Sequence, residues 1–177
     1  MVMDKEFSEQ EDGIKKEKVI EVFNAGHKEF EGLLSKLSDK QIESVPVVGV
    51  WTEREVIAHL AAWHWEQADE ITRVLRNEPT WNQPSYDVYD DDRFNKIQVE
   101  KRKNKSTKDL IQEWEESFDF LIERIKKLSD GEWNHKCEGQ FWDNGKLVTV
   151  QSLFPDEAKR TSDEGRHAAE IKEHFNL

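Results

Sequence analysis

The sequence has only one cysteine, Cys137, and no long apolar segment. A single cysteine can neither close an internal disulfide nor build a thiolate metal cage, which excludes a disulfide-stabilised secreted domain. No apolar run approaches the roughly 18 residues that would span a bilayer. The acidic residues before Gly13 also lack the basic-then-apolar order of a signal peptide. We therefore predict a cytoplasmic protein without a membrane partner.

Glycine and proline are scarce, at 8 and 4 among 177 residues, which disfavours a fold of many strands joined by tight turns. Hydrophobic and charged residues each make up 36% of the chain, a balance typical of amphipathic helices with solvated outer faces. The length suits one domain with a substantial core. These features predict a single all-α domain over residues 14–177, preceded by a flexible acidic N-terminus at residues 1–13.

Basic residues are outnumbered by acidic ones, and the formal net charge is −12. Such a charge repels phosphate backbones and anionic membrane surfaces unless a local basic patch intervenes. The one basic cluster, at residues 101–105, is better explained as the end of one helix and the approach to the next. Nucleic acid is therefore not expected as a partner.

Periodic apolar residues and capping signals divide the domain into helices. The first helix is predicted over residues 14–37 from a stripe that alternates steps of three and four. This stripe consists of Ile20, Phe23, His27, Phe30, Leu34 and Leu37. Thr52 and Glu55 have the spacing of a capping box, which starts a second helix that ends near Asn77.

The second half of the chain continues this pattern after an irregular crossover predicted at residues 79–89. A helix resumes near Asp90, and Ser106 caps a third long helix that runs to Leu128. Pro155 suits the first turn of the last helix. Together these segments predict a four-helix bundle with a long central crossover.

Two connectors resemble each other, at residues 34–42 and 125–133, because each ends a long helix with Leu-Ser-Asp. This echo is explained either by two helix pairs related by a rough two-fold axis or by a common helix exit used twice. After the second copy, Asn144 and Gly145 can turn a short hairpin before the last helix.

No phosphate-binding loop, dinucleotide loop, nucleophile elbow or His-Glu-x-x-His helix is present. The histidines are more informative. His59 lies in an apolar run on the second helix, while Asp163 and His167 are four residues apart and share one face of the last helix. Two histidines and one carboxylate, contributed by two facing helices, suit a divalent transition metal such as Zn, Ni, Fe or Mn. A lone core histidine is the simpler interpretation of His59.

Other polar and aromatic residues are assigned mainly to the core. His27 is interpreted as a core histidine or as a partner of a metal ligand, and His64 is expected to point away from His59. Seven tryptophans are first of all core residues. We nevertheless predict that Trp51, Trp63 and Trp142 lie near the His59 end of the bundle.

The segment from Trp51 to Trp63, with Thr52, Glu55 and His59 at fixed positions, resembles the signature of the DinB/YfiT-like bundle superfamily. Asn95, the stretch from Ser106 and the Leu-Ser-Asp exit are most similar to its DfsB/ClbS branch. The resemblance extends over nearly the whole chain after about residue 14. It implies metal ligands at His59, Asp163 and His167. Asp163 departs from the family pattern, which has His or Glu at this position.

The resemblance implies three alternatives for function. The first is a metal-dependent enzyme, a hydrolase or a thiol-dependent transferase or isomerase, that acts on a small molecule. The second is a metal-free bundle of the ClbS kind that binds a small molecule or protects against one. The third is a structural member without chemistry. Bundles of this kind also form homodimers, but the single sequence does not identify the helical face involved.

Overall fold

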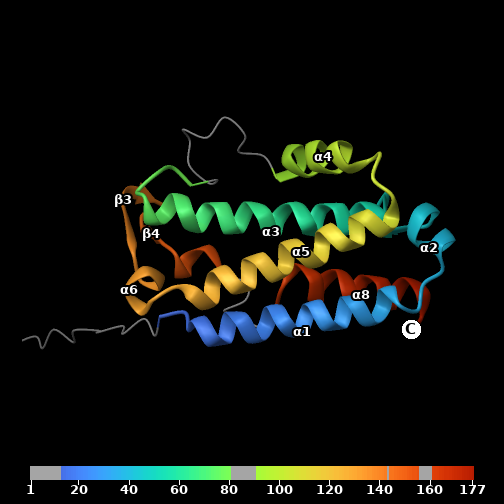
Figure 1. Cartoon of the computed structure of the whole chain (residues 1–177), viewed down its shortest axis with the longest axis horizontal. Coiled ribbons are helices and arrows are strands. Elements are labelled where there is room, and N and C mark those ends of the chain that lie inside the picture. Colours follow the sequence, from blue (N-terminus) through green and yellow to red (C-terminus); the bar gives the residue numbers. More distant parts are fainter. Residues whose placement is uncertain (1–12, 81–90, 143, 156–160) are drawn as a thin grey trace, which may run out of the picture.

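The structure, a computed structural model, describes residues 13–80, 91–142, 144–155 and 161–177. Four long helices form a bundle (Figure 1): α1 (Lys16–Leu34), α3 (Glu53–Leu75), α5 (Thr107–Lys127) and α8 (Asp163–Phe175). The helix α3 packs along α5, and α1 packs along α8. The predicted helical bundle is confirmed. Within the described residues, no helix combines the length and the apolar character that a membrane crossing requires.

Shorter elements connect these helices. Between α1 and α3 lie α2 (Asp39–Ser44) and a small antiparallel pair, β1 (Pro46–Val48) and β2 (Trp51–Thr52). Before α5 lies α4 (Asp91–Arg102). After α5 follow α6 (Asp130–Trp133), β3 (Lys136–Phe141), β4 (Leu147–Thr149) and the 3-10 turn η1 (Gln151–Leu153). The strands β3 and β4 pair antiparallel, so the predicted hairpin around Asn144 is present.

The sequence echo corresponds to a repeated structural unit. Ser38 and Ser129 each begin a short helix with a complete capping box. The serine hydroxyl accepts from the backbone N–H of the residue three positions on, and the side chain of that residue, Gln41 or Glu132, accepts from the backbone N–H of the serine. A small β-pair follows each short helix, and a long helix that carries one of the two candidate histidines follows each pair. The two halves of the bundle are therefore built in the same order.

The last helix begins later in the structure than the sequence predicts. Pro155 is helical, but residues 156–160 lie outside the described residues, and the last long helix begins at Asp163 after the cap Ser162. Ser162 accepts a hydrogen bond from the backbone N–H of Gly165, which identifies it as the N-cap of this helix. Most of the predicted crossover and nearly all of the N-terminus also lie outside the described residues. The helix expected near Asp90 is present as α4.

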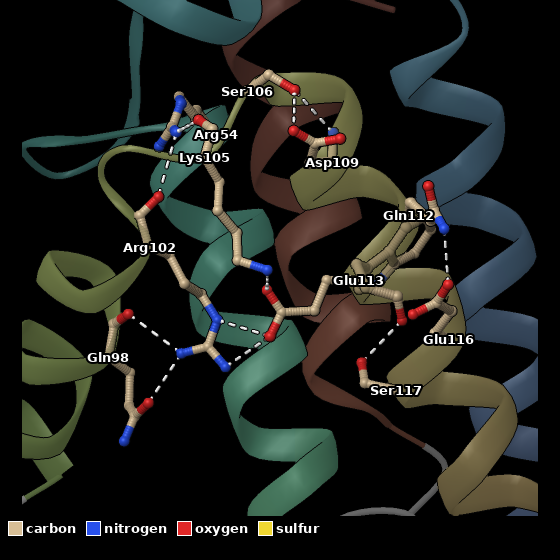
Figure 2. Close-up of polar contacts among 11 residues, drawn as sticks. Arg54, Gln98, Arg102, Lys105, Ser106, Asp109, Gln112, Glu113, Glu116 and Ser117 are labelled. Carbon is tan, nitrogen blue, oxygen red and sulfur yellow. Dashed lines mark hydrogen bonds and ion pairs between the residues drawn. The ribbon is translucent and has the colours of Figure 1, made fainter.

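The helix α4 lies along α3 and is fastened at its C-terminal end (Figure 2). The guanidinium of Arg102 donates to Glu113 Oε1 of α5 from both Nε and Nη2, at 3.1 and 2.8 Å, and the ammonium of Lys105 lies 3.0 Å from Glu113 Oε2. From α3, Arg54 donates to the backbone carbonyls of Arg102, Lys103 and Lys105. These contacts hold α4 against α3, and they thereby place Asn95 next to the middle of the bundle.

Candidate metal centre

As predicted, the capping box of Thr52 and Glu55 starts α3 one residue after Thr52. This start fixes the register of α3, and His59 lies on a side of the helix that faces the interior. The His59 side chain is buried, and its Nδ1 lies 3.0 Å from Asn95 Oδ1. The same Asn95 atom accepts from the indole Nε1 of Trp63 at 2.8 Å. An indole N–H can only donate, so the shared Asn95 atom is an oxygen. His59 therefore carries its proton on Nδ1, and the lone pair of Nε2 is free for a ligand.

His167, on α8, has the same arrangement. Its Nδ1 lies 2.7 Å from Glu170 Oε2, and an ionised carboxylate only accepts hydrogen bonds. The proton therefore resides on Nδ1, and Nε2 presents a lone pair. That Nε2 is buried and has no hydrogen-bond partner. A buried polar atom without a partner is costly in a folded protein, unless something is bound there.

The two imidazoles lie next to each other. Their ring centres are 5.5 Å apart, and the ring planes are nearly perpendicular, at 85°. Two imidazoles that share one tetrahedral zinc ion through Nε2, with bonds of about 2.0 to 2.1 Å, would have ring centres about 5 Å apart. Burial lowers the pKa of His59 to about 4, opposed by the negative charge of Asp163. His59 is therefore neutral at physiological pH, as a metal ligand must be.

Asp163, the third predicted ligand, lies in the first turn of α8 at the edge of this pair. Its Oδ1 accepts from Nη2 of Arg166 at 2.6 Å, and its side chain is 37% exposed. Asp163, His59 and His167 are not gathered as a group of three ligands. Among the described residues, no other group of three His, Cys, Asp or Glu side chains could hold a metal ion either. The structure brings His59 and His167 together, while the complete three-ligand site remains a prediction.

Two of the three tryptophans lie beside His59. The ring centres of Trp51 and Trp63 are 5.6 and 6.3 Å from that of His59, and both rings stand nearly perpendicular to it. Trp142, in contrast, packs against the core cluster that contains Phe118, and its Nε1 donates to Ser152 Oγ at 2.9 Å. The prediction for Trp142 was wrong because a connector, unlike a helix, gives no register that places its residues.

An open groove of about 470 Å³ adjoins the site. It runs between the start of α3 and α4, and its lining consists of Trp51, Glu55, Lys96, Ile97, Val99 and Glu100. Trp51 contacts both this groove and His59, and Lys96 directly follows Asn95. His59 and His167 are not part of this lining, so a small molecule in the groove would lie against Trp51, the neighbour of His59.

A buried polar network around Glu164 of α8 was not predicted from the sequence. Glu164 Oε1 accepts from Trp114 Nε1 at 2.6 Å and lies 3.0 Å from His27 Nδ1. His64 is also buried, and its Nδ1 lies 3.1 Å from Ser117 Oγ of α5. As predicted, it lies on another side of α3 than His59. The signal was present: both His27 and Trp114 lie on apolar stripes, and their nitrogens need buried acceptors.

The sequence matches the model of the DinB superfamily over residues 23–154. The structure is similar to that of a mycothiol-dependent maleylpyruvate isomerase, with a TM-score of 0.66 and 15% identity over 89% of this chain. This chain spans 60% of the length of that isomerase. YfiT from Bacillus subtilis, described as a probable metal-dependent hydrolase with an unusual four-helix bundle topology, is also similar. Its TM-score is 0.63 at 18% identity, over 100% of this chain and 94% of YfiT. No curated protein matches.

Proposed function

Because the chain belongs to the DinB superfamily, we propose that it is a metal-dependent enzyme that acts on a small molecule, with His59, Asp163 and His167 as metal ligands. The observation that carries this proposal is the buried Nε2 of His167, which has no partner although the His59 ring lies beside it. The bundle shared with the isomerase and with YfiT agrees with an enzyme of this type.

Each residue of the site has a definite role in this proposal. Asn95 and Glu170 hold the Nδ1 protons of the two histidines, which orients both rings and leaves both Nε2 atoms as donors to the metal. Asp163 would complete the set by exchanging Arg166 for the metal. A bound Zn, Ni, Fe or Mn dication would supply Lewis-acid chemistry, lowering the pKa of a coordinated water or thiol.

The groove between α3 and α4 supplies a binding surface for the small-molecule substrate. Trp51 and Ile97 offer apolar surface, and Lys96, Glu55 and Glu100 offer charges of both signs. Trp51 and Trp63 also flank the buried ring of His59. This arrangement agrees with a hydrolase or with a thiol-dependent transferase or isomerase.

A second candidate is a metal-free bundle of the ClbS kind, which would bind or neutralise a small molecule through the same groove. The ion pair between Asp163 and Arg166 favours it, because this pair occupies the carboxylate that a metal would need. Membership of the DfsB/ClbS branch, which we propose from the resemblance of the sequence, is compatible with either candidate.

Metal content distinguishes the two candidates. The full chain, purified without a metal-affinity tag, is analysed for its elements before and after addition of Zn²⁺ or Ni²⁺ and dialysis. We expect one equivalent in the unmodified protein and none in His59→Ala, while His174→Ala, an exposed histidine of α8, keeps the full amount. Absence of metal even after addition would support the metal-free candidate. Full metal content in His59→Ala would refute the ligand assignment.

A further inference from the structure

A single oxygen atom of Glu164 lies at the meeting point of all four long helices. Glu164 belongs to α8, and its side chain is 1% exposed. Its Oε1 accepts from Trp114 of α5 at 2.6 Å, lies 3.0 Å from Nδ1 of His27 on α1, and lies 3.6 Å from Nε2 of His64 on α3. One carboxyl oxygen therefore contacts polar nitrogens from each of the other three helices.

Apart from Glu164, α8 packs through buried apolar side chains such as Ala168 and Ile171, whose contacts are not directional. The helix packs mainly along α1 and only slightly against α3, although α3 carries His59. Against α1, Gly165 lies close to Gly26, where two residues without side chains meet. Such a contact is close but has no directional bond, whereas hydrogen bonds to Glu164 depend on direction.

Glu164 is also well placed to act on the candidate site. It precedes His167 by three residues, so both side chains project from neighbouring positions on the same side of α8, about 4.5 Å apart along the helix axis. A rotation that moved Glu164 away from Trp114 and His27 would move His167 away from His59 as well.

We propose that Glu164 is a positioning residue, whose hydrogen bonds to Trp114 and His27 set the rotation of α8 so that His167 faces His59. Its consequence for metal binding rests on the proposed function, but the orientation of His167 exists without metal and can be tested without it. Glu164 itself is not a ligand in this proposal: its Oε1 already accepts from the indole, and its Oε2 is buried without a hydrogen-bond partner, so the Co²⁺ titration below tests a ligand role directly.

Three variants of the full chain separate positioning from general packing. Glu164→Leu removes the acceptor and leaves the indole and imidazole nitrogens without a partner. Glu164→Gln keeps an oxygen for Trp114 and serves as the conservative rescue. Glu173→Gln, on the exposed side of the same helix, is the matched control.

The first measurement is the nuclear Overhauser effect between the ring protons of His59 and His167 in metal-free protein. We expect it in the unmodified protein, in Glu164→Gln and in Glu173→Gln, and we expect its loss in Glu164→Leu. The second is titration with Co²⁺, in which Glu164→Leu should bind at least about tenfold more weakly with altered d–d absorption bands. Glu164→Gln should stay within about threefold of the unmodified protein.

Retention of the ring contact in Glu164→Leu would overturn the proposal, even if its melting temperature fell. A loss of the bound Co²⁺ equivalent in Glu164→Gln would overturn it as well, because Glu164 would then be a ligand. If the unmodified protein bound no Co²⁺, the proposed function would fail, while the ring contact would still decide the role of Glu164. If Glu164→Leu did not unfold cooperatively, the test would use Trp114→Phe, which removes only the indole donor. This variant should weaken the ring contact between His59 and His167, and an unchanged ring contact would refute the proposal.

Discussion

His59 and His167, which are separated by most of the bundle's sequence, stand with their rings 5.5 Å apart and nearly perpendicular, each with Nδ1 bonded to a side-chain oxygen. Both rings are therefore held in the tautomer that leaves Nε2 free. This is the arrangement by which proteins prepare imidazoles for a metal, with an outer residue that sets both proton and orientation.

The outer residue Asn95 gives the first prediction. Asn95→Ala removes the acceptor of His59 Nδ1–H and of Trp63 Nε1–H, so the His59 ring loses its orientation. We expect Zn²⁺ affinity to fall about 10- to 100-fold in a competition titration with a chromogenic chelator. Asn104→Ala, in the exposed turn after α4, is the control and should bind as the unmodified protein does. Equal affinity in both variants would contradict the role given to Asn95.

Two glycines of α1 give a second prediction. A Cβ at Gly26 would clash with Ser162 Oγ and lie 2.9 Å from the backbone nitrogen of Gly165, whereas a Cβ at Gly32 would meet nothing within 4 Å. Gly26→Ala should lower the free energy of unfolding by about 1 to 3 kcal/mol, as overpacking does. Gly32→Ala should raise it by about 0.5 to 1 kcal/mol, because alanine is the better helix former. Urea unfolding at one pH measures both, and a destabilised Gly32→Ala would contradict the interpretation.

Local signals in the sequence predicted the elements that depend on local physics. The capping box at Thr52 and the cap at Ser106 began helices where expected, because each satisfies backbone groups within one turn. The inward direction of His59 followed from its apolar neighbours. The helix start at Asp163 is not predicted, because Pro155 also suits a first helical turn, although Ser162 has the residue type of a cap.

Contacts between distant segments could not be predicted in this way. The bond from His59 to Asn95 depends on how α4 returns along α3 after the crossover, which no short pattern encodes. The convergence on Glu164 requires the relative rotation of four helices, which follows from packing as a whole. The sequence thus predicted the two histidines that the structure brings together, but not the residues that orient them.

Glu53 gives a prediction about pH. Its side chain is completely buried and both carboxyl oxygens lack a hydrogen-bond partner, so burial raises the pKa of Glu53 from its ordinary 4.5 to about 8. Between these values the folded protein holds a proton that the unfolded chain releases. Stability from this residue is therefore fully present below pH 4.5 and is lost as the pH rises toward 8, by up to about 1.4 kcal/mol per pH unit.

Glu53→Gln removes this proton linkage. The variant should unfold like the unmodified protein near pH 4.5 and should be more stable than it at pH 8, by a few kcal/mol at most. Thermal and urea unfolding across this range measure the difference. Glu31→Gln, an exposed position of α1, should leave the pH dependence unchanged. A constant difference between Glu53→Gln and the unmodified protein at all pH values would show that Glu53 does not retain a proton on folding.

The ion pair between Arg102 and Glu113 gives the last prediction, because it fastens α4 to α5 (Figure 2). Both side chains are mostly buried, at 11% and 15% exposed, so their contact is worth more than a surface pair, about 1 to 2 kcal/mol. Arg102→Gln should therefore speed amide hydrogen exchange in α4 about 5- to 30-fold, with little change in the cores of α3 and α5. Lys101→Gln, one residue away and exposed, is the control. Because α4 carries Asn95, Arg102→Gln should also weaken Zn²⁺ binding. Unchanged hydrogen exchange in α4 would mean that the packing of α4 along α3, and not the ion pair, holds Asn95 next to His59.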